Sequence, residues 1–231
     1  LNLARATLKI INTWADRTTS YRLEFLALRD RARSNLCCLI ETETKRIEAD
    51  AAESHYQTLD TKTHQALVDE AKANAPIADA TKWNAVENSI ARKMVRAHNV
   101  ESQAKRGEAG WDAVERQWTD AYQSLDPLDA NYAYCERRIK LAQKQGVFAA
   151  VPNTNIRDGA SQLKRLCADP VLSEDGEVWL THGKHCRNAV ANVLENPIGL
   201  ADFNLRDMAR DARRSLERAR QFSGTTSDAT E

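Results

Sequence analysis

The first 75 residues of the chain combine a recurring apolar stripe with a complete lack of glycine and proline. The stripe follows heptad spacing and is widened on one side; its members include Leu3, Thr7, Ile10, Trp14, Leu8, Ile11 and Ala15. This pattern predicts one continuous helix from about Leu3 to Lys72, roughly 105 Å long at 1.5 Å per residue. Because the stripe is wide and drifts in phase, it favours a bundle of three or more helices over a two-stranded coiled coil.

A second helix follows from the same periodicity. The residue before a proline avoids the helical region, so the first helix should end at Ala75, before Pro76. Asp79 or Thr81 then provides an N-cap. The apolar spacing continues from there to Gly146, with a kink expected at Asp126-Pro127.

A third helix is expected over residues 183–222, with an interruption at 196–199. Three long helices with short connections predict an all-α fold, an elongated antiparallel three-helix bundle. We expect residues 1–222 to form this single elongated domain and residues 223–231 to form a polar flexible tail.

Two segments have the composition of loops, namely residues 146–158 and 169–181, which flank a short helical segment at 161–168. We expect them to build a small irregular head, with a short strand or hairpin at Val178-Trp179 as a further option. Loops on a rigid frame often carry binding residues. The candidate ligand-binding residues are therefore Phe148, Val151, Asn153, Asn155, Ile156, Val178 and Trp179. The alternative is that their apolar members form a small satellite core.

Charge and motifs argue against several functions. The 33 basic and 33 acidic residues give zero net charge, which argues against nucleic acid as the main partner. No run of about 18 apolar residues is present, so no membrane span is predicted. The sequence has no common nucleotide-binding, hydrolase or zinc-protease motif, and we expect no catalytic residue, cofactor or metal. His182, His185 and Cys186 resemble metal ligands locally, but two exposed histidines at a helix start are the favoured interpretation.

The five cysteines are Cys37, Cys38, Cys135, Cys167 and Cys186. In a three-helix bundle with turns near residues 76 and 151, Cys135 lies level with Cys167, and Cys186 lies level with Cys37 and Cys38. This register favours one disulfide between Cys135 and Cys167 and another between Cys186 and Cys37 or Cys38. Such bonds would indicate a secreted or surface protein. The alternative is that the cysteines are small buried apolar groups with free thiols.

The segment RGEAGWDAVERQW (Arg106–Trp118), the glycine-free first helix and the late cysteines resemble the invariant surface glycoproteins of African trypanosomes. The sixty-five kilodalton class is the preferred match, and the seventy-five kilodalton class is the second. The resemblance implies a membrane-anchored cell-surface receptor, held by an anchor outside this chain and passing through endosomes during uptake. For the preferred class the implied partner is host complement C3 and its fragments, bound for immune evasion. For the second class it is the Fc part of immunoglobulin.

Two other classes of function remain as alternatives. An intracellular helical scaffold would require reduced cysteines and self-association along a helix face. An enzyme is disfavoured, because no catalytic constellation is recognisable in the sequence.

Overall fold

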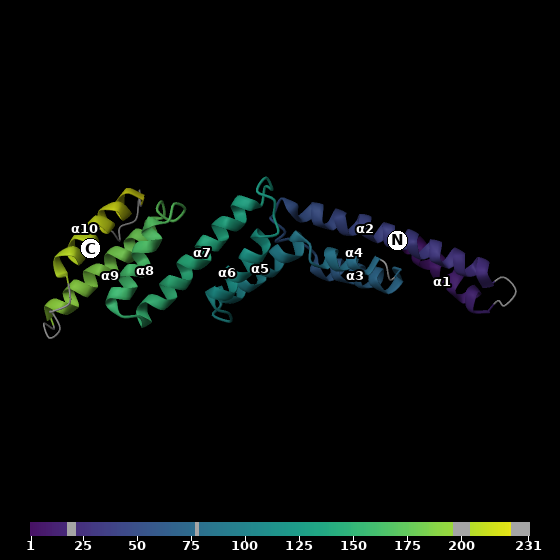
Figure 1. The fold of residues 1–231 in the computed structure, drawn as a ribbon, viewed down its shortest axis with the longest axis horizontal. Coiled ribbons are helices and arrows are strands. Elements are labelled where there is room, and N and C mark those ends of the chain that lie inside the picture. The colour runs from purple at the N-terminus through teal and green to yellow at the C-terminus, as the bar shows by residue number, and fades with distance from the viewer. Residues whose placement is uncertain (18–21, 77–78, 196–203, 223–231) are drawn as a thin grey trace. The chain divides into compact units, whose positions relative to one another are not determined.

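The computed structural model describes residues 1–17, 22–76, 79–195 and 204–222 (Figure 1). Within these ranges every regular element is a helix and no strand occurs, so the predicted all-α class is confirmed. No helix in the described ranges is long and apolar enough to cross a membrane. The predicted interruption at 196–199 and the predicted tail at 223–231 lie outside the described residues.

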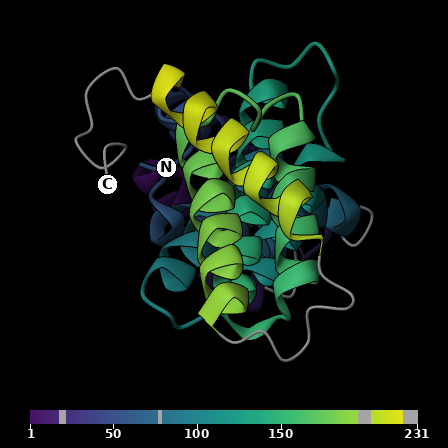
Figure 2. The ribbon, with the colours of Figure 1, turned by 90° about the vertical axis from the view of Figure 1, so that its left-hand side faces the viewer.

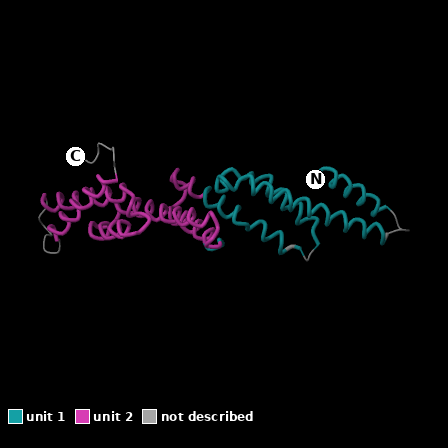
Figure 3. Tube along the Cα trace, turned by 90° about the horizontal axis from the view of Figure 1, so that it is seen from above, with its two compact units in different colours: residues 1–99, 123–125 teal, residues 100–122, 126–231 magenta. Residues whose placement is uncertain are grey.

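The chain divides into two compact units (Figure 3). Unit 1 contains Leu1–Asn99 and Gln123–Leu125, and unit 2 contains Val100–Tyr122 and Asp126–Glu231.

The helices of unit 1 are α1 (Asn2–Arg17), α2 (Arg22–Ala52), α3 (Thr61–Asn74), α4 (Ala80–Glu87) and the first part of α5 (Ile90–Lys105). The predicted continuous helix over 3–72 is therefore wrong, because three helices occupy this stretch. After α2, His55 and Tyr56 adopt φ values of 49° and 63°, which are incompatible with a right-handed helix. Asp60 is the N-cap of α3, and its side chain accepts a hydrogen bond of 3.1 Å from the Thr63 amide.

Packing in unit 1 brings α1 alongside α2 instead of in line with it (Figure 1). The core formed by α1, α2, α3 and α4 consists of Leu8, Leu36, Cys37, Ile40, Leu67, Ala71 and Trp83. The predicted break at Pro76 is confirmed, since α3 ends at Asn74 and Ala75 is extended. Asp79 occupies the N-cap position of α4 but makes no side-chain capping bond.

The helices of unit 2 are the end of α5, α6 (Trp111–Tyr122), α7 (Tyr132–Ala150), α8 (Ile156–Ala168), α9 (Gly176–Glu195) and α10 (Leu205–Phe222). The predicted second helix is thus divided among α4, α5, α6 and α7. Gly107 explains the break between α5 and α6. It lies just after α5 with a φ of 76°, and its amide donates a hydrogen bond of 3.0 Å to the Ala104 carbonyl. This is how a glycine terminates a helix.

The predicted third helix is an antiparallel pair, in which α9 and α10 lie side by side (Figure 2). Gly183 of α9 faces Leu216 of α10, and a Cβ added at Gly183 would lie 2.8 Å from the Leu216 Cγ. The absence of a side chain at this position lets the two helices approach closely. Shorter helices and a helical hairpin therefore replace the three long helices that the sequence predicted.

Candidate functional site

The predicted irregular head is mostly helical. α7 continues through Gly146 to Ala150, a 3-10 turn covers Val151–Asn153, and α8 begins at Ile156. Because α9 begins at Gly176, residues 176–181 are helical as well. Neither 146–158 nor 169–181 is the long loop expected from sequence, and Val178-Trp179 is not a strand. Only the turn 169–175 remains between α8 and α9.

The apolar candidate residues belong to one small core in unit 2. Val178 is fully buried and Val151 nearly so, and Phe148 and Trp179 pack against them while half-exposed. The other buried members are Leu163, Leu166, Cys167 and Leu172. Phe148, Val151, Val178 and Trp179 therefore belong to a small satellite core, which is the alternative that the sequence left open.

Polar contacts fix the aromatic members of this core. The Trp179 Nε1 donates a hydrogen bond of 2.8 Å to the Ser173 carbonyl, which ties α9 to the preceding turn. The Lys144 Nζ lies 5.5 Å from the centre of the Phe148 ring, within cation–π range. Both aromatic rings thus have packing partners inside unit 2.

The remaining candidates lie at the start of α8. The Asn155 side chain accepts a hydrogen bond of 2.9 Å from the Asp158 amide and so caps this helix. The Ile156 carbonyl accepts a hydrogen bond of 3.0 Å from the His185 Nε2. Asn153 is exposed in the 3-10 turn. The structure thus separates these residues by role, with Asn155 capping, Ile156 bonding to α9 and Asn153 at the surface.

Two lysines of α7 form ion pairs with acidic residues at the two ends of the 169–175 turn. The Lys140 Nζ is 2.7 Å from an Asp169 carboxylate oxygen at the start of the turn. One helical turn later, the Lys144 Nζ is 2.9 Å from Asp175 and 2.6 Å from Glu177. The Lys144 side chain is only 7% exposed, so solvent screens its ion pairs less than it screens surface pairs.

The charged state of these groups depends on their contacts. Burial would lower the pKa of Lys144, but the hydrogen bonds that its Nζ donates to Glu177 and Asp175 raise it above the ordinary lysine value. Burial would raise the pKa of Asp169, but bonds from Lys140 and from the backbone N–H groups of the turn lower it. The turn is therefore held by ionised side chains at neutral pH.

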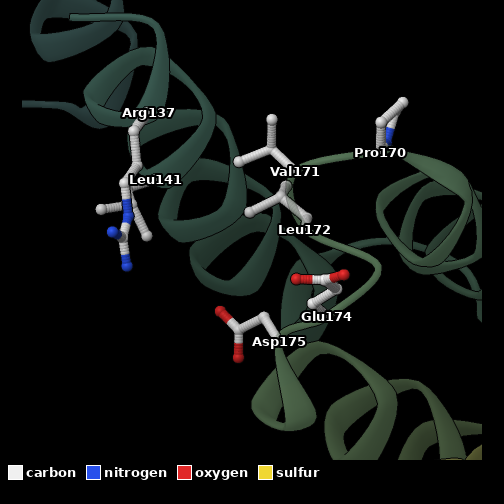
Figure 4. A pocket seen from close by; sticks show the side chains of 7 residues that line it. All are labelled: Arg137, Leu141, Pro170, Val171, Leu172, Glu174 and Asp175. Atoms are coloured by element: carbon white, nitrogen blue, oxygen red, sulfur yellow. The ribbon is translucent and has the colours of Figure 1, made fainter. Parts of the chain in front are cut away.

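A pocket of about 520 Å³ lies between α7 and this turn (Figure 4). Its lining residues are Arg137, Leu141, Pro170, Val171, Leu172, Glu174 and Asp175. Figure 4 shows Arg137 and Leu141 on one side and residues 170–175 on the other. Leu172 is buried, whereas Arg137, Pro170, Val171 and Glu174 are exposed. The pocket is therefore an open surface depression lined by both apolar and charged side chains, with a cation on one side and carboxylates on the other.

The histidine-rich start of the predicted third helix lies inside α9. His182 is buried, contrary to the expected exposure; its Nδ1 is 2.8 Å from the Ser215 Oγ, and its Nε2 is 3.5 Å from the Cys186 Sγ. Burial lowers the pKa of His182 and raises the pKa of Cys186 to about 11. The imidazole and the thiol are therefore neutral at neutral pH, which does not suit a nucleophile and its base. No cluster of three or more metal-binding side chains occurs among the described residues.

All five cysteines carry free thiols, and only Cys38 is exposed. The predicted bonds from Cys135 to Cys167, and from Cys186 to Cys37 or Cys38, are not formed. Their register assumes a bundle of three long helices with turns near residues 76 and 151, and the observed helix breaks remove that register. The alternative, small buried groups with free thiols, describes four of the five.

The sequence reasoning missed Arg137, Lys140 and Lys144 as the residues of α7 that face the turn. The sequence shows that Lys140 and Lys144 share a helix face and that the segment DPVLSEDGE is acidic, but no local pattern places the two together. Lysines at this spacing share a helix face and are suited to holding carboxylates at separate points.

No protein-family model matches the chain, and searches of the curated proteins and of the solved structures return no match either.

Proposed function

We propose that the chain is a helical binding protein that captures another protein through the pocket beside the 169–175 turn. The observation that carries this proposal is an open pocket in which apolar side chains lie between an arginine on one side and carboxylates on the other. Within the described ranges, neither the Arg137 guanidinium nor the Glu174 carboxylate has an ion pair or a hydrogen bond. Their charges are therefore available to a partner.

The shape of the pocket favours a protein over an enclosed small ligand. Small-molecule sites typically bury about 70–90% or more of their ligand. Here Arg137, Pro170, Val171 and Glu174 are exposed, so the depression opens to the surface. One apolar side chain of a partner fits against Leu141 and Val171, while charged neighbours on the partner meet Arg137 and Glu174.

Rigidity supports the same proposal. Ion pairs from Lys140 and Lys144 hold the two ends of the turn, and the Trp179 bond to Ser173 holds its middle. A preformed surface loses less conformational entropy on binding than a mobile loop does.

The resemblance supplies the identity of the partner in this proposal. It makes the chain a cell-surface receptor of a trypanosome that binds a host serum protein for immune evasion. The first partner is complement C3 and its fragments, and the second is the Fc part of immunoglobulin.

A specific observation favours the intracellular helical scaffold as the second candidate function. All five thiols are free, which is the usual state in a reducing compartment. In that case the pocket would bind an intracellular protein.

The test measures binding of the full chain to a purified complement C3 fragment and to purified Fc. Val171 is 39% exposed, so Val171→Asp should fold normally but place a charge on the apolar wall. We expect it to weaken binding at least about thirtyfold, the loss typical of an interface anchor. The matched control is Leu128→Asp, because Leu128 is 95% exposed, lies in unit 2 and does not line this pocket. Equal weakening by both variants would refute the pocket, and binding to neither protein would refute the receptor assignment.

A further inference from the structure

The α1–α2 hairpin of unit 1 exposes large apolar side chains along both helices. On α1, Leu3 is 81% exposed, Ile10 is 59% exposed and Trp14 is 58% exposed. On α2, Leu28 and Leu39 are 45% and 44% exposed. We call these five residues the hairpin face.

Helix geometry places the members of each helix on one side. Leu3, Ile10 and Trp14 are separated by seven and four residues, which returns the side chain to nearly the same direction. Leu28 and Leu39 are eleven residues apart, about three turns, and share one direction on α2 in the same way.

α1 therefore has two apolar faces. One is formed by the buried residues Leu8, Ile11 and Ala15, and its Leu8 packs against α2 in the core of unit 1. The other is the exposed part of the hairpin face. A helix with two apolar faces is suited to two helical neighbours, and this explains why the stripe was too wide for a two-stranded coiled coil.

We propose that the hairpin face is a self-association surface, on which a second copy of this chain docks its own α1–α2 hairpin. Two helical hairpins that bury their apolar faces against each other complete a four-helix bundle. A two-fold axis makes such an interface from one patch used twice. The inference is independent of the pocket in unit 2.

The available area fits a dimer. At about 200 Å² for each large apolar residue, the exposed fractions of the five residues amount to roughly 570 Å² per copy. The pair would then bury about 1,150 Å², just above the ~1,000 Å² expected of a biological interface. An area at this end of the range predicts a reversible dimer and not an obligate one.

The charges around the face also permit pairing with a copy of itself. The nearest polar neighbours of Ile10 on the exposed side of α1 are uncharged, namely Thr7 and Thr13. The exposed charged residues toward the end of the hairpin include both signs, namely Arg17, Glu24 and Arg31. A surface with one sign of charge would repel its own copy, and this one does not present such a surface.

The test is sedimentation equilibrium of the full chain over a concentration series in the micromolar range. A reductant is present throughout, because the exposed Cys38 could otherwise link two copies covalently. The wild type should shift reversibly from 25.9 kDa toward twice that mass. The double variant Ile10→Glu, Trp14→Glu should weaken dimerisation at least about thirtyfold while keeping the helical circular dichroism.

The matched control is Leu194→Glu, because Leu194 is an exposed apolar residue of α9 in unit 2. This variant should dimerise like the wild type. A wild type that stays at 25.9 kDa throughout the series would overturn the proposal. So would a dimer that survives in the double variant. Binding of the monomer to anionic lipid vesicles, lost in the double variant, would assign the face to a membrane surface and overturn it as well.

Discussion

Gly183→Ala tests the antiparallel pairing of α9 and α10. A methyl group at this position would lie 2.8 Å from the Leu216 Cγ, 2.9 Å from its Cδ2 and 3.2 Å from its backbone nitrogen. Overpacking of this kind costs about 1–3 kcal/mol, and three close contacts place it in the upper part of that range. Alanine is favoured over glycine inside a helix by about 1 kcal/mol, which offsets part of the cost. We expect net destabilisation of about 1–2 kcal/mol.

The decisive measurement is a double-mutant cycle with Leu216→Ala, read by urea denaturation and helical circular dichroism. Removing the Leu216 side chain makes room for the methyl group, so Gly183→Ala should become neutral or slightly stabilising in that background. The coupling energy should therefore be about 1–2 kcal/mol, as for residues in contact. In one continuous helix the two positions would lie about 50 Å apart. A coupling energy near zero would refute the pairing of α9 with α10.

Three further predictions concern buried polar groups. Lys144→Met leaves the Asp175 carboxylate without its cation and should destabilise the chain by about 1–3 kcal/mol in urea denaturation, whereas the exposed Lys184→Met should change stability little. Burial opposes ionisation of Glu101, but Lys105 and Arg138 lower the pKa of its carboxyl group in the folded chain. The ionised carboxylate therefore stabilises the fold above a pH of about 4.3, the pKa of an unfolded glutamate, and this stabilisation is lost as the pH falls through the lower pKa of the folded chain. Urea titrations at falling pH should show this loss in the wild type and not in Glu101→Gln. Burial raises the pKa of Cys135 to about 11 and that of Cys167 to about 12, so alkylation at pH 8 followed by mass spectrometry should label Cys38 first. Labelling of Cys167 as fast as Cys38 would contradict the structure.

Helical class and one helix end could be predicted from local chemistry. The stripe of Leu3, Ile10 and Trp14 is helical as expected, and Pro76 ends α3 because proline restricts the residue before it. The turn after α2 could not be predicted in the same way. It has no glycine or proline, and His55 and Tyr56 take left-handed conformations that neither residue type favours.

The irregular head is predicted from the loop-like composition of residues 146–158 and 169–181, but the glycine of each segment lies within or at the start of a helix. Gly146 lies inside α7, and Gly176 is the first residue of α9. A glycine is only mildly unfavourable in a helix, and tertiary packing overrides that preference. Trp179 was therefore placed in a loop, although it lies on α9.

The sequence predicts only one side of the candidate site, the segment after α8. The acidic segment after α8 was recognised as irregular, and residues 169–175 do form a turn that lines the pocket. Phe148 and Val178 were selected because they are apolar, and the same property places them in the core. Arg137 and Lys144 come from α7, about 30 residues earlier in the chain, and their proximity to the turn arises from tertiary structure. That information is not contained in a local pattern.

The most direct test of the proposed pocket is hydrogen–deuterium exchange of the full chain, alone and with a saturating purified complement C3 fragment. The amides of 137–141 and 169–175 should exchange more slowly in the complex, because partner side chains would cover both sides of the pocket. The amides of α1 and α2 should be unchanged when the chain concentration is kept equal. Slower exchange confined to other helices, or no change in any peptide, would contradict the proposal that this pocket binds the partner.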